Sequence, residues 1–137
     1  MTAILDTSFL FALNDRGDRN HERVLAVAKN VSEALILPAV VLPEISYLIA
    51  SRLGHKAMRH FVYSLTTSAV QIEPVLLEDL VRVHEVLEQY ADSQLDFTDS
   101  AIVTIAERLA ITRIYTLDRR DFSLIRPRHC GYFELLP

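Results

Sequence analysis

Short apolar runs alternate with longer amphipathic segments along this chain, and this alternation limits the folds open to it. The short runs are typical of buried strands, whereas the longer segments repeat their apolar residues at helical spacing. With only three glycines and five prolines, the chain has little room for the tight turns of an all-β fold. Because strands alternate with helices, we expect βαβ units and a mainly parallel central sheet covered on both faces.

The pattern also predicts where the elements lie. Strands are expected at Ala3–Leu5, Ala34–Leu37, Val70–Ile72, Arg113–Leu117 and Gly131–Leu135. Helices are expected at His21–Asn30, Pro43–Leu53, Lys56–Leu65, Glu78–Tyr90 and Thr98–Leu109. Pro43 suits the first turn of its helix, and Gly54 suits the position that ends it. No repeat or linker-like segment interrupts the series, so residues 1–137 are expected to form one domain.

Several classes of protein are disfavoured by composition. No apolar run approaches the roughly 20 residues that a membrane-spanning helix needs. The N-terminus carries Asp6 within its apolar stretch and has no basic residues before it, so a signal peptide is not expected. A lone cysteine, Cys130, excludes an internal disulfide framework and fits the reducing cytoplasm.

The net charge of −4 would ordinarily count against nucleic-acid binding. However, arginine supplies every basic residue except Lys29 and Lys56, and arginine suits bidentate phosphate recognition. Four arginines lie close together near the C-terminus: Arg119, Arg120, Arg126 and Arg128. This group fits either a solvated surface turn or a phosphate-binding surface.

Four acidic residues are expected to meet at one edge of the predicted sheet. Asp6 and Asp118 each follow an expected strand directly, whereas Glu44 and Asp99 fall in the first turns of expected helices. Parallel strands end at one edge, and the helices that follow them begin there. Ligands of such sheets bind beyond that edge. The sequence therefore predicts a cluster of carboxylates from distant positions.

Taken singly, each of these acids could be a helix cap, a turn residue or a favourable charge at a helix N-terminus. Taken together, they would repel one another without a counter-charge. An oxygen-only cluster suits Mg²⁺ or Mn²⁺, and no histidine or cysteine pattern suits zinc. We therefore expect Asp6, Asp99 and Asp118 to bind a metal. Glu44 is expected to contribute directly or through water, and Asp96 as an auxiliary ligand.

Such a site suggests metal-dependent hydrolysis at phosphorus. Arg119 and Arg120 are placed to hold substrate phosphates beside the acids. The hydroxyls of Thr7, Ser8 and Thr116 could orient carboxylates, water or phosphate, or could cap the local backbone.

Two other functions use a strand-end aspartate. A phosphatase with Asp6 as its nucleophile would want a second aspartate where Ser8 stands. A non-enzymatic, receiver-like domain phosphorylated on an aspartate would want a lysine in the pocket, and it has no obvious need for Glu44. Both alternatives therefore fit the pattern less well than metal-dependent hydrolysis.

Four segments of the chain resemble, in order, the signature segments of PIN-domain proteins, in particular VapC-like ribonuclease toxins of toxin–antitoxin pairs. They are ILDTSFLFAL, LPEISYLI, FTDSAIVTIAERL and IYTLDRRDF, of which the last two together are the most specific. The resemblance spans nearly the whole chain. It implies an α/β/α sandwich, Mg²⁺ or Mn²⁺ dependence and endonucleolytic cleavage of RNA. It also implies a homodimer and a small antitoxin that blocks the site.

The resemblance also assigns residues by position. Asp6, Glu44, Asp99 and Asp118 match the acidic quartet of the family, and Asp96 matches an additional acid of some members. PIN domains also act in RNA processing outside toxin–antitoxin pairs, so that function stays open. The RNA target and the number of metal ions are open as well.

Overall fold

The computed structural model describes residues 1–137 and contains a five-stranded sheet whose neighbouring strands are all parallel. The strands are β1 (Thr2–Leu5), β2 (Ala34–Pro38), β3 (Gln71–Glu73), β4 (Arg113–Tyr115) and β5 (Glu134–Leu136). Their spatial order is β3-β2-β1-β4-β5, so the first strand of the chain is the central one. The parallel sheet expected from the sequence is confirmed.

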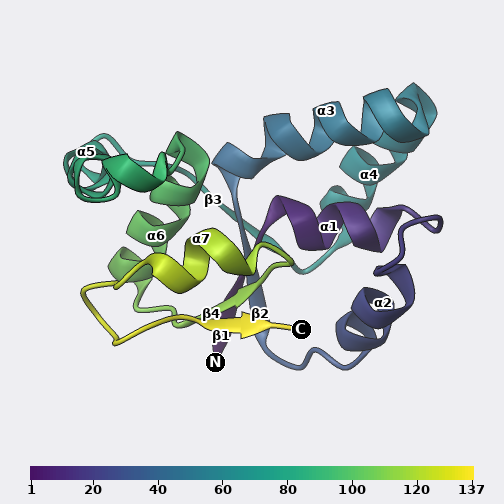
Figure 1. The fold of residues 1–137 in the computed structure, drawn as a ribbon. Coiled ribbons are helices and arrows are strands. Elements are labelled where there is room, and N and C mark those ends of the chain that lie inside the picture. Colours follow the sequence, from purple (N-terminus) through teal and green to yellow (C-terminus); the bar gives the residue numbers. More distant parts are fainter.

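Seven α-helices surround the sheet: α1 (Thr7–Asn14), α2 (His21–Lys29), α3 (Leu42–Leu53), α4 (His55–Thr67), α5 (Asp79–Gln89), α6 (Phe97–Leu109) and α7 (Arg119–Leu124). Figure 1 shows α1–α4 on one side of the sheet and α5–α7 on the other. The three-layer α/β/α sandwich implied by the resemblance is therefore confirmed. Helices α1 and α7 were not assigned from the sequence pattern. No helix combines the length and apolar character that crossing a membrane would require.

Strand register places apolar side chains on both faces of the sheet. Ile4 in β1 lies opposite Ile36 in β2 and Ile114 in β4. Because side chains alternate along a strand, these three residues share one face, and Tyr115 points to the other. There its ring lies 5.2 Å from the ring of Phe9 in α1, measured between centroids. Burial on both faces explains why the strands read as continuous apolar runs.

Helix α6 runs through the interior of its layer, with every residue from Asp99 to Ala106 buried. Two ion pairs tie its outer end to α5. Arg82 donates to both carboxylate oxygens of Glu107 at 2.8 and 3.0 Å, and Arg108 pairs with the buried Asp79 at 3.0 Å. Packing and ion pairs thereby hold α6 with its N-terminus at the carboxyl-end edge of the sheet.

The chain turns sharply at two places that matter for the site. Strand β4 ends at Tyr115, two residues earlier than expected, although the Thr116 N–H still donates to the Leu136 carbonyl at 2.7 Å. The chain then turns into α7. Gly54 alone separates α3 from α4, with a φ of +103° that is inexpensive only for glycine. It ends α3 as expected.

Candidate metal centre

The four predicted acids line one cavity of about 270 Å³ at the carboxyl-end edge of the sheet. Asp6 comes from the end of β1, Glu44 from the first turn of α3, Asp99 from the first turn of α6, and Asp118 from the residue before α7. The other lining residues are Thr7, Ser8, Leu48, Asp96 and Asp121. The fold therefore brings together carboxylates that lie more than a hundred residues apart in the sequence.

Asp6 is the most buried acid of the cavity, with 5% of its surface exposed. Its backbone N–H donates to the Tyr115 carbonyl at 3.0 Å, which joins it to the sheet. Thr116 Oγ1 donates to the Asp6 carboxylate at 2.7 Å, and Ser8 Oγ donates to it at 3.1 Å. Burial raises the pKa of the Asp6 carboxyl, while these hydrogen bonds oppose the rise.

The hydroxyls of Ser8 and Thr116 also accept hydrogen bonds from the backbone beyond β4. Ser8 Oγ accepts from the Leu117 N–H, and Thr116 Oγ1 accepts from the Asp118 N–H, each at 2.9 Å. Thr116 has no exposed surface, so it has no direct access to a substrate. Of the roles left open by the sequence, orienting carboxylates is the one that these contacts match. Thr7 Oγ1 is buried without a hydrogen-bond partner.

Asp96 and Asp99 form the N-terminus of α6. Asp96 is the N-cap, and its carboxylate accepts a hydrogen bond from the Asp99 N–H at 2.8 Å. Burial, together with the charges of Asp96, Asp6, Asp118 and Asp121, raises the pKa of the Asp99 carboxyl to about 8. Asp96 therefore both caps the helix and adds negative charge to the cavity.

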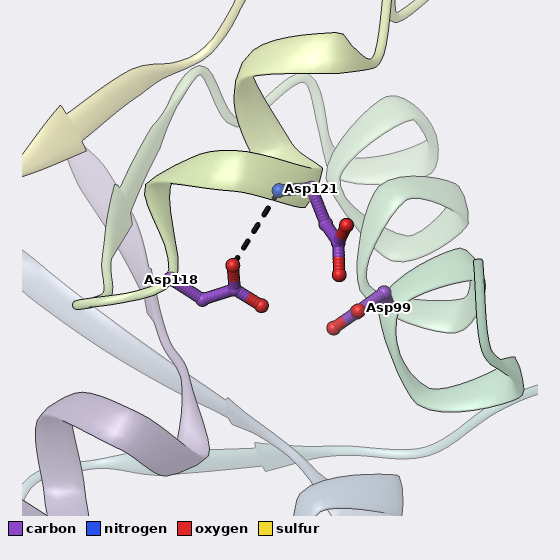
Figure 2. Close-up of side chains that lie close together, drawn as sticks. All are labelled: Asp99, Asp118 and Asp121. Carbon is purple, nitrogen blue, oxygen red and sulfur yellow. Dashed lines mark hydrogen bonds between the residues drawn. The ribbon is translucent and has the colours of Figure 1, made fainter. Parts of the chain in front are cut away.

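Figure 2 shows the carboxylates of Asp99, Asp118 and Asp121 turned toward one another. One oxygen from each lies within 4.8 Å of the others. The Asp118 carboxylate caps α7 by accepting from the Asp121 N–H at 3.4 Å, although burial still raises the pKa of Asp118. Sequence reasoning missed Asp121. The signal available was its position three residues after Asp118, a spacing that places both acids on one side of a helical first turn.

Glu44 occupies a different part of the cavity. It lies in the exposed first turn of α3, outside the group of three mutually close aspartates. No cation of the chain pairs with it. Glu44 therefore keeps a free carboxylate at the cavity wall.

These residues fit a divalent cation. The donors are all oxygen atoms, as Mg²⁺ and Mn²⁺ prefer. Mutual repulsion contributes to the raised pKa of Asp99, and a dication among the acids would offset that repulsion. Asp99, Asp118 and Asp121 are close enough to share one ion, and Asp6 lines the same cavity.

Neither arginine expected to bind phosphate lines the cavity. The Arg119 guanidinium donates to the carbonyl oxygens of Leu135 and Pro137 at 3.2 and 2.5 Å, so it is turned toward β5. Arg120 is exposed and has no side-chain partner within the chain. A phosphate-binding role stays a prediction for both arginines, although one nitrogen of the Arg119 guanidinium is engaged by backbone oxygens at the C-terminus.

Comparison with known proteins agrees with this geometry. Residues 3–126 match the model of the PIN domain. Over 134 residues the chain is 31% identical to ribonuclease VapC26 of Mycobacterium tuberculosis, covering 98% of this chain and 99% of that protein. The chain therefore belongs to the PIN-domain family, as the four sequence segments suggested. It is a homologue of a VapC ribonuclease.

Solved structures share the fold. VapC20 of Mycobacterium tuberculosis, described as a sarcin–ricin loop cleaving toxin, superposes with a TM-score of 0.83 at 23% identity, covering 93% of this chain and 98% of that chain. VapBC2 from Rickettsia felis, bound to a promoter DNA fragment, gives 0.72 at 15% identity over the whole of both chains. DNA-bound VapBC from Salmonella typhimurium gives 0.69 at 14% identity over 98% of each chain.

The hydroxyl of Thr116 can be tested without changing side-chain shape. In Thr116→Val, Asp6 loses a donor and the Asp118 N–H loses an acceptor, so we expect Mg²⁺ affinity to fall roughly 10–100-fold. Isothermal titration calorimetry measures this loss. Thr116→Ser keeps the hydroxyl and should bind Mg²⁺ almost as the parent does. Equal weakening by both variants would show that the hydroxyl does not position the acids.

The raised pKa of Asp99 predicts how the stability of the metal-free protein depends on pH. Its folded pKa of about 8 lies above its usual value, so its contribution to stability is complete below about pH 4 and is lost as pH rises toward 8. At pH 8, ionisation of Asp99 lowers the free energy of unfolding by on the order of 2 kcal/mol. The cost is no larger because water at the cavity mouth screens part of the repulsion. In EDTA, Asp99→Asn should therefore raise the melting temperature at pH 8 but not at pH 4. A pH-independent difference between the two proteins would contradict this explanation.

Proposed function

We propose that this protein is an endoribonuclease that uses Mg²⁺ or Mn²⁺ and acts as the toxin of a toxin–antitoxin pair. The observation that carries the proposal is the group of Asp99, Asp118 and Asp121 in one cavity with Asp6 and Glu44. Homology to a ribonuclease supports RNA as the substrate. The oxygen-only donor set supports a hard divalent cation.

The acids of the cavity have different proposed roles because their environments differ. Asp99, Asp118 and Asp121 would hold the metal, with Asp6 directed toward the same space by Ser8 and Thr116. When bound, such a cation lowers the pKa of water and stabilises the leaving oxygen in attack at phosphorus. The exposed Glu44 carboxylate is free to orient the attacking water and accept its proton. Asp96 supports Asp99 from the cap of α6.

Cleavage of RNA by matched variants tests this assignment. With Mg²⁺ or Mn²⁺ present, we expect the parent to cleave RNA and EDTA to abolish cleavage. Asp99→Asn should lower the rate more than 100-fold. That loss exceeds the usual effect of changing a residue that only hydrogen-bonds to a metal ligand. Asp92→Asn, outside the cavity, is the matched control and should cleave as the parent does. If folded Asp99→Asn cleaves RNA at the parental rate, the site assignment is wrong.

The toxin role and the partner are inferred from relatives. The similar VapBC structures support a cognate antitoxin, which would close the acidic cavity, and a homodimer is part of the same proposal. Because the similar toxin VapC20 cleaves the sarcin–ricin loop, that loop belongs among the test substrates beside single strands. RNA processing outside a toxin–antitoxin pair is the alternative function.

Growth distinguishes the two functions. Low-level expression of a toxin should arrest a bacterial host, and Asp99→Asn should not, because arrest depends on cleavage. Colony counts after induction measure the effect, with Asp92→Asn as the control that should still arrest growth. Normal growth of cells that contain demonstrably active enzyme would favour RNA processing instead.

A further inference from the structure

Residues 45–72, which form most of α3 and all of α4, contain no Asp or Glu. The same segment carries Arg52, Lys56 and Arg59, besides two histidines. All three side chains belong to exposed residues, and none pairs with a carboxylate. We call Arg52, Lys56 and Arg59 the α3–α4 basic surface. In a protein with a net charge of −4, this helix pair thus carries positive charge that no acid of the same segment offsets.

Arg52 lies on the helix that carries two residues of the candidate metal centre, and Lys56 and Arg59 follow it beyond the turn at Gly54. Glu44 and Leu48 line the cavity, and Arg52 follows Leu48 at helical spacing of four residues. Glu44, Leu48 and Arg52 therefore form one stripe along α3. At about 1.5 Å per residue, Arg52 lies roughly 12 Å along the axis from Glu44. Figure 1 shows α3 running away from α6 and α7 before it turns back into α4.

Arg52 is held in place before any ligand arrives. Its guanidinium carbon lies 5.4 Å from the ring centroid of Phe11, a largely buried residue of α1. Stacking on a ring face leaves the N–H edges of the guanidinium free to donate. On α4, the Arg59 guanidinium lies 2.6 Å from His55 Nδ1. Such restraint reduces the ordering entropy lost when a phosphate binds.

Most other arginines are already engaged. Those that pair with carboxylates are Arg82, Arg108, Arg113 and Arg128. Arg119 and Arg126 donate to backbone carbonyls. By contrast, no hydrogen bond within the chain engages the side chain of Arg52 or Lys56, and that of Arg59 contacts only His55. The arginines that remain unpaired elsewhere have acids beside them in the sequence, as Arg16 has Asp15 and Arg120 has Asp121.

We propose that the α3–α4 basic surface binds the phosphodiester backbone of single-stranded RNA that extends from the cleavage position. Tyr47 supports a single strand, because it is 72% exposed on the same helix and offers a ring on which an unpaired base can stack. The cations also offset the repulsion between the acidic cavity and a polyanion. This inference rests on the proposed ribonuclease function.

RNA binding at several salt concentrations tests the surface. An Asp99→Asn background keeps the RNA intact, and fluorescence anisotropy measures the affinity for a labelled single strand of about 20 nucleotides. Replacing Arg52, Lys56 and Arg59 by Gln should make the negative slope of log K against log salt shallower by about 2. Each single-strand phosphate contact contributes about −0.7 to that slope. Lys29→Gln, an exposed cation on α2, should leave the slope unchanged. An unchanged slope in the triple variant, with the same melting temperature as its parent, would overturn the proposal.

Cleavage separates this inference from the function on which it rests. In the active protein, the triple variant should lower kcat/KM at least tenfold for the 20-nucleotide strand. It should hardly affect a dinucleotide, whose single phosphate occupies the cleavage position and cannot also reach Arg52, roughly 12 Å away along α3. Equal effects on both lengths would overturn the surface proposal while leaving the ribonuclease intact. If the parent cleaves neither RNA, the proposed function fails, and the anisotropy slope still decides whether the surface binds RNA.

Discussion

Burial of the Asp6 carboxylate at the end of the central strand is the constraint on which the site depends. An ionised carboxylate removed from water is very unfavourable unless hydrogen bonds compensate it. Ser8 and Thr116 supply those bonds, and they also accept from the backbone N–H groups of Leu117 and Asp118. The two hydroxyls that stabilise Asp6 therefore also position the segment that carries Asp118 and Asp121.

The distribution of charge explains how an acidic protein can be suited to RNA. Six carboxylates line one cavity at the sheet edge, where the charges of neighbouring acids contribute to the raised pKa of Asp99. A dication would convert that edge into a site that attracts phosphate. Free cations lie on the adjoining helix pair, where they are not neutralised by neighbouring acids. Net charge alone therefore says little about the partner of this protein.

The elements that the sequence predicted well are those with a clear period. The strands and the longer helices were found because their burial repeats along the chain. Helix α1 was missed because Thr7–Asn14 is apolar at most positions and shows no helical stripe. Helix α7 was missed because six residues are too few for a period to appear. Asp121 was missed with it, since its position depends on that helix.

The sequence by itself determined the parallel α/β class, the positions of acids after strands and at helix starts, and the likeness to PIN domains. These features depend on the local order of residues, which periodicity and motifs record directly. Only the tertiary structure decided that Asp121 joins Asp99 and Asp118, that Arg119 turns toward β5, and that Thr116 is committed to Asp6. Those outcomes depend on strand order and on how helices pack. Distances between side chains far apart in the sequence follow from that packing and from no local pattern.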